Sequence, residues 1–556
     1  MLKDSILTIL KKHRGFFLAT SLATIFFLGN LIWIYKDTGL PFIGDDSRYL
    51  QATYEMYSPI KDGNLSEAYN RWETLFIHPD RFPRTPLFAM LSVPSFLIFG
   101  VSEDIALATN VFVLFVNSLL LFCLTQILFK QKSKAQAVFA GLVTVLLYNT
   151  MPGFLGYARL YMSETLQTTF VLLIVLFVLK YGKKAGIKEF FVLGIVSALA
   201  ILLRFLMPFY LLIPALLLIY LQISNKEAKV QYLRRIVAFL FGFIPLFLTW
   251  YGNNLAAYIE FTKFTSSGSL ASFYSLGPVS DPMTAIRFGY IIVTWLFGWP
   301  AFLLSMFLLL VFIVRLVKKY KQINFKQLLL DKRVLLLLTP IPFLITLFLS
   351  ESKTARYFVP VMALWLPLLS YLSIDMIKNI KAAKYLVGFL LILIAYPFMQ
   401  TIFGFLPRMP LTGMNPANAF YREQMSENLP YDFFLDAYKQ FTDKDYRIYN
   451  LAEQPSFNDA QLIWYATQKG VSIKNSHEFS RYTSLEDGYK ELEKADIVVV
   501  TNNPEGDGFW IEKYLDIAKY VRESNDFMHL VTSEEFTSGR SYSIYLSTKT
   551  FERISL

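Results

Sequence analysis

The 556-residue chain has a single cysteine, only four histidines and few charged residues, and these scarcities narrow its class. Cys123 lies inside an apolar run, so an intrachain disulfide is impossible and cysteine usage does not reveal the redox compartment. Charged residues make up 17% of the chain and hydrophobic residues 54%, so the chain is too apolar for a soluble globular protein. It is also too long to be a single membrane anchor. The composition therefore predicts an α-helical polytopic membrane protein.

Nucleotide-binding signatures and repeats are also absent from the sequence. No G-x-G-x-x-G follows a predicted strand, no Walker A pattern occurs, and we find neither a fixed-period repeat nor a low-complexity tract. The net charge of +11 would suggest nucleic acid in a soluble protein, but here the basic residues fall in short loops between apolar runs. Nucleic acid is therefore not an expected partner.

Eleven uncharged stretches are candidate spans, because most of them approach the roughly 20 residues that a membrane-crossing helix needs. They are residues 15–35, 105–129, 135–157, 165–179, 190–203, 205–225, 236–259, 288–314, 334–350, 357–374 and 385–407. Every second loop between them is rich in lysine and arginine, which predicts a cytoplasmic N-terminus and an outer C-terminus in the plasma membrane. The first stretch lacks a small-residue cleavage site and is expected to stay as an anchor.

The apolar segment 86–101 does not fit this alternation, because its crossing the membrane would move every later basic loop to the outside. It is short for a span and contains Pro86 and Pro94. We expect an interfacial helix that lies on the outer face or dips into it. The first outer loop then covers residues 36–104, within a membrane domain of residues 1–407.

Residues 408–556 are expected to form a separate extracytoplasmic α/β domain. Charged residues, asparagine and glycine return there, and the apolar runs shorten. The patterns predict strands at 446–450, 496–501 and 542–546 and helices at 460–468 and 510–523.

An acidic pair, Asp45 and Asp46, follows the first predicted span and precedes Arg48. Ionisable groups near a membrane are costly and are usually kept for a pathway, an ion pair or a reaction. The acids could supply a catalytic base, and Arg48 a partner for an anionic substrate. The alternative is that the pair caps a helix or marks the water boundary.

Further charged residues fall on the same predicted outer side of the bundle. They are Arg159 and Glu164 in the second outer loop, Arg204 between the fifth and sixth spans, and Glu351, Lys353 and Arg356 before the tenth. An arginine near the membrane is energetically costly unless an anion pairs with it, because its guanidinium does not lose its proton. Arg204 therefore predicts either an internal pair with Glu164 or Asp45, or a bound phosphate.

Five short motifs occur in a recognisable order along residues 15–405. They are Asp45-Asp46-Ser47-Arg48-Tyr49, Arg84-Thr85-Pro86-Leu87, Leu97-Ile98-Phe99-Gly100, Ser163-Glu164 and Arg356-Tyr357-Phe358-Val359-Pro360. This ordered set resembles the GT-C glycosyltransferases that use polyprenyl-phosphate sugars, namely the lipid A aminoarabinose transferases and the protein O-mannosyltransferases. The resemblance implies a GT-C-like bundle of about 11 transmembrane helices.

The same resemblance implies roles for individual residues. Asp45 matches the catalytic base, Asp46 stands where the family usually has Glu, and Glu164 matches the second acidic position of the cavity. Glu164 could instead cap the fourth span next to Ser163. The expected ligands of the donor phosphate are Arg48, Arg84, Arg204, Lys353 and Arg356; Arg84 and Arg204 occupy positions where the aminoarabinose transferases carry lysines.

The expected activity is an inverting transfer of a sugar from a polyprenyl-phosphate donor to an acceptor hydroxyl outside the membrane. Nucleotide sugars are not supplied there, so the sugar must arrive on a lipid carrier. A carboxylate takes the proton of the attacking hydroxyl, and fixed cations stabilise the leaving phosphate. Retention would require a second, closely spaced nucleophilic carboxylate.

Three other classes stay open. A lipid-linked glycan ligase or polymerase also moves sugars outside the membrane, and a non-catalytic receptor could use the outer domain. A secondary transporter commonly has repeat halves with broken helices, neither of which the sequence reveals.

No cofactor is expected to be required, because arginines are available for the phosphate. A divalent cation is left open, with Asp45, Asp46, Glu164, His78 and Glu351 as candidate ligands. His78, Arg159 and Glu351 are also candidates for acceptor contacts or for loop structure, and His78 is more typical of a loop or interfacial residue than of a ligand. The expected partners are the lipid-linked donor, a lipid, glycan or protein acceptor, and membrane lipids.

Overall fold

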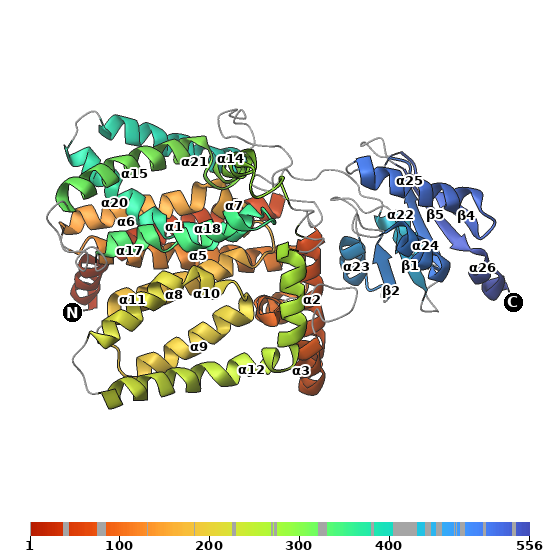
Figure 1. Ribbon diagram of the computed structural model, residues 1–556, viewed down its shortest axis with the longest axis horizontal. Coiled ribbons are helices and arrows are strands. Elements are labelled where there is room, and N and C mark those ends of the chain that lie inside the picture. Colours follow the sequence, from red (N-terminus) through yellow and green to blue (C-terminus); the bar gives the residue numbers. More distant parts are fainter. Residues whose placement is uncertain are drawn as a thin grey trace. The chain divides into compact units, whose positions relative to one another are not determined.

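The computed structural model divides into two compact units (Figure 1). The structure describes residues 2–36, 44–74, 85–130, 132–182, 184–224, 229–267, 271, 275–320, 331–379, 383–403, 431–439, 446–451, 459–471, 473, 475–478, 484–503, 508–535 and 541–555. The first unit comprises Met1–Lys36, Met56–Ser95 and Ala106–Arg422, and the second comprises Asp37–Glu55, Phe96–Ile105 and Glu423–Leu556. The predicted domain boundary at residues 407 and 408 lies outside the described residues.

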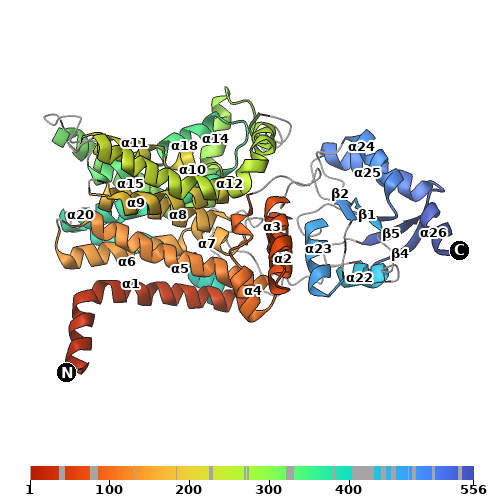
Figure 2. The ribbon, with the colours of Figure 1, turned by 90° about the horizontal axis from the view of Figure 1, so that it is seen from below.

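The chain up to residue 403 is helical wherever the structure assigns regular elements, and its long helices lie side by side in Figures 1 and 2. The elements are α1 (Leu2–Lys36), α2 (Gly44–Lys61), α3 (Leu65–Thr74), η1 (Pro86–Phe88), α4 (Val93–Phe99), α5 (Glu103–Leu128), α6 (Lys134–Thr150), α7 (Pro152–Ala158), α8 (Glu164–Tyr181), α9 (Ile187–Leu203), α10 (Met207–Tyr210), α11 (Leu212–Ile223), α12 (Lys229–Ser267), α14 (Pro282–Ile291), η2 (Ile292–Phe297), α15 (Trp299–Tyr320), α17 (Lys332–Leu338), α18 (Ile341–Leu349), η3 (Ala355–Phe358), α19 (Val359–Met362), α20 (Trp365–Asn379) and α21 (Ala383–Phe403).

Within the described chain, six helical segments are long and apolar enough to cross a membrane, and nine qualify if each bent pair counts as one span. The six are Arg14–Lys36, Glu103–Leu128, Glu164–Tyr181, Val230–Lys263, Lys332–Leu349 and Lys384–Phe403. Two further predicted stretches coincide with the shorter helices α9, of 17 residues, and α11, of 12 residues. All eleven stretches are therefore helical, and the chain is built as an integral membrane protein.

Three of the stretches are bent pairs of helices, which the sequence did not reveal. The pairs are Lys134–Thr150 with Pro152–Ala158 (61°), Pro282–Phe297 with Trp299–Val311 (107°), and Ala355–Met362 with Trp365–Lys378 (58°). In the sharpest pair, Gly298 has φ +70°, a conformation that glycine adopts without steric cost, and Pro300 fits the first turn of the next helix. This turn divides the candidate span at 288–314 into two helices.

Glycines allow α9 and α12 to pack closely. A Cβ atom at Gly194 would lie 2.2 Å from the carbonyl oxygen of Phe239, and one at Gly242 would lie 2.3 Å from the carbonyl oxygen of Phe191. No real Cβ tolerates such distances, so the two backbones can meet only where side chains are missing.

The segment predicted as an interfacial helix at 86–101 consists of η1 and the seven-residue α4. Seven residues rise roughly 10 Å, too little to cross a bilayer. The Phe88 ring lies 4.8 Å from the Tyr161 ring, centroid to centroid, and the Thr85 hydroxyl donates a 2.7 Å hydrogen bond to the Leu203 carbonyl. These contacts attach the segment to the loop before α8 and to the end of α9.

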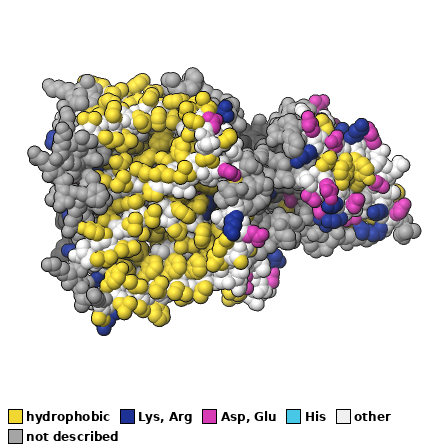
Figure 3. Space-filling model, in the orientation of Figure 1, with side chains coloured by type: hydrophobic (Ala, Val, Ile, Leu, Met, Phe, Trp, Pro, Cys, Tyr) yellow, Lys and Arg dark blue, Asp and Glu magenta, His cyan; other side chains and the backbone are white. Residues whose placement is uncertain are grey.

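Hydrophobic side chains cover the face of the bundle seen in Figure 3. Large apolar side chains of the bundle are strongly exposed, for example Phe241 (71%) and Ile25 (62%). An apolar surface of this extent is unfavourable in water and is suited to contact with the hydrocarbon core of a membrane.

Residues 431–555 form a five-stranded sheet between helices, as Figures 1 and 2 show. The elements are α22 (Tyr431–Lys439), β1 (Arg447–Asn450), α23 (Asp459–Gln468), β2 (Asn475–Glu478), α24 (Leu485–Lys494), β3 (Ile497–Thr501), α25 (Gly508–Glu523), β4 (Phe527–Thr532), β5 (Tyr542–Ser547) and α26 (Thr548–Ser555). The strand order is β2-β1-β3-β5-β4, with β1 parallel to β2 and β3, and β5 antiparallel to β3 and β4.

The central strand β3 is buried on both faces, which explains its continuous apolar sequence. Ile497 and Val499 pack in one core with α22 and α23, whereas Val498 and Val500 pack in the other with α24 and α25. The predicted α/β content of the C-terminal region is thus confirmed, including strands β1, β3 and β5. The sequence missed β2, β4, α22, α24 and α26.

Candidate functional site

Two arginines meet one buried glutamate in the helical bundle. Nη1 of Arg204 lies 3.4 Å from Oε1 of Glu164, and Nε of Arg356 lies 3.7 Å from the same oxygen. The Glu164 side chain is 2% exposed, whereas Arg204 keeps 17% and Arg356 keeps 20%. Two cations thus share one buried carboxylate, and both keep part of their side chains exposed.

Three chain segments bring these groups together. Glu164 is the first residue of α8, where the helix dipole stabilises a carboxylate. Arg204 directly follows α9 with an extended backbone (φ −164°), and the carbonyl of the preceding Leu203 accepts the hydrogen bond from Thr85. Arg356 lies in the 3-10 turn η3 after α18.

The ring of Tyr357 makes cation–π contacts with both guanidinium groups. The Cζ atoms of Arg204 and Arg356 lie 4.1 and 5.2 Å from its ring centroid, and the Tyr210 hydroxyl donates a 2.8 Å hydrogen bond to its carbonyl oxygen. Contact with a ring face uses the cation's charge but leaves the N–H groups at its edge for hydrogen bonds. Sequence reasoning missed this role, although Tyr357 directly follows Arg356.

The second carboxylate oxygen of Glu164 is also informative. Oε2 is buried, and no donor among the described residues reaches it. Buried carboxylate oxygens are normally hydrogen-bonded, so this atom is suited to accept a hydrogen bond from a ligand hydroxyl. The capping alternative for Glu164 receives no support, because its carboxylate meets arginines, while Gln167 donates to the Ser163 hydroxyl.

The acidic pair lies in the first turn of α2, a helix that the sequence did not predict. Asp46 is 1% exposed, Ser47 is fully buried, and Arg48 is half-buried; the side chain of Asp45 lies outside what the structure describes. The positive end of a helix stabilises carboxylates, so this position fits the helix-capping alternative as well as a reactive group held in place.

The acid-bearing half of α2 belongs to the second unit. There Oε1 of Gln51 accepts a 3.4 Å hydrogen bond from the Thr467 hydroxyl of α23, and Nε2 of Gln51 donates to Glu55 at 3.2 Å. Gln51 and Thr467 are 416 residues apart in the sequence, so their contact could not be predicted from local patterns.

Lys353 has its own contacts near the end of α18. Its ammonium donates to the carbonyls of Leu347, Phe348 and Ser350 at 3.2, 2.6 and 2.5 Å. A cation at these carbonyls is favourable because they form the negative end of the helix dipole. Burial lowers the pKa of Lys353 from its usual value. Its predicted contact with the donor phosphate stays a prediction.

Arg159 is completely buried and connects helices of the bundle. Its Nε donates a 2.8 Å hydrogen bond to Oδ1 of Asn30 in α1, and its Cζ lies 4.5 Å from the Trp33 ring and 5.9 Å from the Phe398 ring of α21. Glu351, by contrast, is exposed.

His78 and Arg84 lie outside the described residues, and their predicted roles stay predictions. Within the described part of the chain, no group of three or more His, Cys, Asp or Glu side chains could hold a metal ion. That finding does not extend to the side chains of Asp45 and His78, so the divalent cation stays open.

Residues 79–250 match the model of the dolichyl-phosphate-mannose-protein mannosyltransferase family. The matched segment contains Glu164 and Arg204 but neither Asp45 nor Arg356. Among curated proteins, none matches the sequence.

The chain is also similar to a crystal structure of ArnT from Cupriavidus metallidurans bound to undecaprenyl phosphate, with a TM-score of 0.51, 14% identity, and coverage of 94% of this chain and 98% of that one. The fold is that of ArnT. Another structure of ArnT from this organism, in the apo state, has a TM-score of 0.49, 14% identity, and coverage of 95% and 98%. The ArnT-like architecture confirms the predicted GT-C-like fold.

Proposed function

We propose that the protein is a membrane glycosyltransferase that moves a sugar from a polyprenyl-phosphate donor to an acceptor hydroxyl outside the membrane, with inversion at the anomeric carbon. The observation that carries the proposal is the pair of partly exposed arginines, Arg204 and Arg356, on buried Glu164. The mannosyltransferase family match and the ArnT fold, in a structure that contains undecaprenyl phosphate, support the same donor class.

Arg204 and Arg356 act on the donor phosphate. Their guanidinium groups are already partly desolvated and oriented, so a phosphate gains strong charge-assisted hydrogen bonds without much further ordering. As the bond between the anomeric carbon and the phosphate oxygen breaks, negative charge grows on the phosphate. Fixed cations therefore stabilise the transition state more than the ground state.

The proton and bond changes balance with one base. Asp45 takes the proton of the acceptor hydroxyl, the hydroxyl oxygen bonds to the anomeric carbon, and the polyprenyl phosphate leaves as its anion. Asp45 is assigned on the sequence resemblance alone. Glu164 accepts a hydrogen bond from a sugar hydroxyl through Oε2 and orients the donor.

The direct test is transfer by the purified full-length protein. Lipid-linked sugars that copurify with the Asp45→Asn protein are identified by mass spectrometry, and the identified donor is then offered to the wild-type protein with candidate acceptors. We expect a polyprenyl monophosphate sugar and a glycoside product. A polyprenyl pyrophosphate donor would instead indicate a lipid-linked glycan ligase or polymerase.

A secondary transporter is the second candidate, because the structure contains three bent helix pairs and broken helices are common in transporters. Ion-gradient-driven uptake of a sugar or sugar phosphate into proteoliposomes, without formation of a glycoside, would favour this class over the glycosyltransferase.

A further inference from the structure

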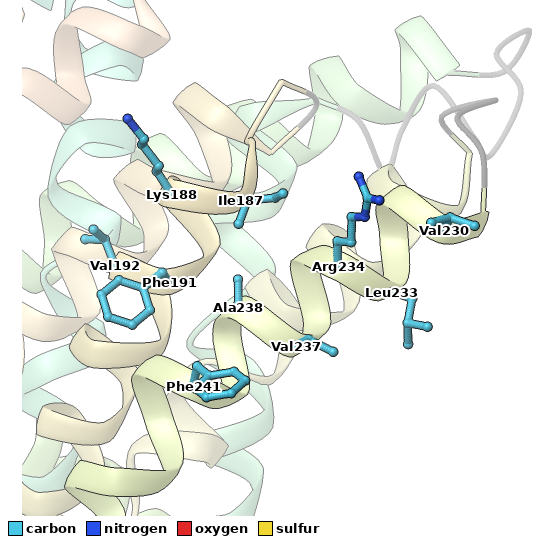
Figure 4. A pocket seen from close by; sticks show the side chains of 10 residues that line it. All are labelled: Ile187, Lys188, Phe191, Val192, Val230, Leu233, Arg234, Val237, Ala238 and Phe241. Carbon is cyan, nitrogen blue, oxygen red and sulfur yellow. The ribbon is translucent and has the colours of Figure 1, made fainter.

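An apolar groove of about 750 Å³ lies between the first turns of α9 and α12 (Figure 4). It is lined by Ile187, Lys188, Phe191, Val192, Val230, Leu233, Arg234, Val237, Ala238 and Phe241. Eight of these ten residues are apolar, and the other two are cationic. Several apolar wall residues are more than half exposed, among them Leu233 (60%) and Phe241 (71%), so the groove opens on the outer surface of these two helices.

The two cations have no protein partner in the part of the chain that the structure describes. Figure 4 shows the charged tips of Lys188 and Arg234 on the same side of the view, away from Phe241. Neighbouring charged groups are already engaged: Arg235 donates a 2.7 Å hydrogen bond to Gln222, and the carboxylate of Glu189 accepts one of 2.8 Å from the Gly186 backbone.

The groove is remote from the Glu164 cluster. Lys188 lies in the first turn of α9 and Arg204 directly follows its last residue, so sixteen residues of about 1.5 Å rise separate them by roughly 24 Å. Basic residues also gather near the starts of both helices. Lys180 ends α8, Lys184 lies between α8 and α9, and Lys229 is the first residue of α12. Basic residues of this kind mark the membrane surface at the end opposite to Arg204.

We propose that this groove binds an anionic glycerophospholipid from the leaflet next to the basic loops. The phosphate lies between Lys188 and Arg234, and one acyl chain follows the apolar wall toward Phe241. The order of groups decides the ligand: two cations without a partner among the described residues lie at the surface end, and an apolar groove open to hydrocarbon continues from them. A phospholipid has the complementary order, and basic pockets between spanning helices are typical sites for anionic headgroups.

Native mass spectrometry of the full-length detergent-solubilised protein tests the proposal. The protein is mixed with equal amounts of phosphatidylglycerol and phosphatidylcholine, and the bound lipids are counted. The wild-type protein should retain phosphatidylglycerol preferentially. The double variant Lys188→Gln, Arg234→Gln should lose that preference, with about five-fold weaker binding for each cation removed, because a basic residue near an anionic lipid contributes about that factor.

A matched variant controls for the loss of two positive charges. Arg14→Gln with Lys384→Gln removes two exposed cations away from the groove and should leave lipid retention unchanged. Val192→Trp fills the groove without changing charge and should reduce phosphatidylglycerol binding. Binding of the polyprenyl-phosphate donor should be normal in all of these variants, so failure of the lipid site and failure of the proposed function are separable.

Three results would overturn the proposal. They are equal retention of both lipids by the wild-type protein, unchanged phosphatidylglycerol binding in the Lys188→Gln, Arg234→Gln variant, and an equal loss in the charge control. A dimer that disappears in the groove variant would assign this face to a second copy of the chain instead.

Discussion

The bundle contains arginines in two different settings. Arg159 is completely buried, donates to neutral Asn30 and lies against the Trp33 ring. Arg204 and Arg356 instead share the carboxylate of Glu164 and the ring of Tyr357, and each keeps about a fifth of its side chain exposed.

This difference separates a structural cation from a binding cation. In both settings a guanidinium inside the protein is costly, since it cannot lose its proton. A fully enclosed guanidinium, however, offers no surface to a substrate, whereas Arg204 and Arg356 each keep part of the side chain exposed. Removal of Arg159 should therefore affect stability, and removal of Arg204 or Arg356 should affect binding.

The largest expected effect is all-or-none and concerns the side of the membrane on which the Glu164 cluster lies. In a Cys123→Ala background, a cysteine at exposed Ser66 should react with an impermeant maleimide in intact cells, and one at exposed Ser133 should react only after lysis. The basic loop at Ser133 is predicted to be cytoplasmic. Labelling of Ser133→Cys in intact cells would place the segment 86–101 across the membrane and contradict an outer site.

The next largest effect separates chemistry from binding. Asp45→Asn keeps the side-chain shape but cannot accept a proton, so transfer should fall by about 10²- to 10⁴-fold while donor binding survives. Single-turnover transfer and donor affinity are measured on the same preparation. Near-normal transfer would move the base to Asp46 or Glu164, and Asp46→Asn is the matched variant that distinguishes these outcomes.

Arg204→Gln and Arg356→Gln test the binding side of the comparison. Loss of a hydrogen bond to a charged group costs about 1.5–3 kcal/mol, so each variant should bind the polyprenyl-phosphate donor about ten- to a hundred-fold more weakly. The thermal midpoint should change little, because the remaining arginine still pairs with Glu164. Unchanged donor affinity in both variants would assign the arginines to structural pairing with Glu164 alone.

Arg159→Met tests the structural side. Methionine keeps most of the buried volume but loses the hydrogen bond to Asn30 and the contact with Trp33, so the free energy of unfolding should fall by about 1–3 kcal/mol. Donor affinity should stay at the wild-type value when measured below the unfolding transition. A selective loss of donor affinity would show that the two settings are not distinct.

The smallest effect is expected at Lys353, a third cation near the cluster in sequence. Lys353→Met removes donors to the last carbonyls of α18 and should reduce stability by about 0.3–1 kcal/mol, the range for a cation at a helix C-terminus. Donor affinity should not change. A loss comparable to that of Arg204→Gln would restore Lys353 as a phosphate ligand.

Local sequence patterns were weakest where helices bend and where strands are short. The bend at Gly298 depends on the packing of η2 and α15, and one glycine in an apolar run does not reveal it. The strand β2, Asn-Ser-His-Glu, has no apolar alternation, and the helices α22 and α24 gain their stability from the sheet that they cover.

The sequence indicated which charged residues belong to the candidate site, but it did not indicate which of them contact one another. The scarcity of charge made Glu164, Arg204 and Arg356 stand out, because a charged residue beside apolar runs needs a reason. Tyr357 and the Thr85 contact with Leu203 carried no such signal, since aromatic and hydroxyl side chains are common near membrane surfaces.

The sequence by itself determined the membrane class, the positions of the apolar helices and the existence of an α/β domain near the C-terminus, because these follow from composition and from the period of apolar residues. Only the tertiary structure decided that Glu164 meets both Arg204 and Arg356 while Arg159 is enclosed by Asn30 and aromatic rings. The physical reason is that a charge selects its partner by distance in space, and helix packing sets that distance between residues far apart in the chain.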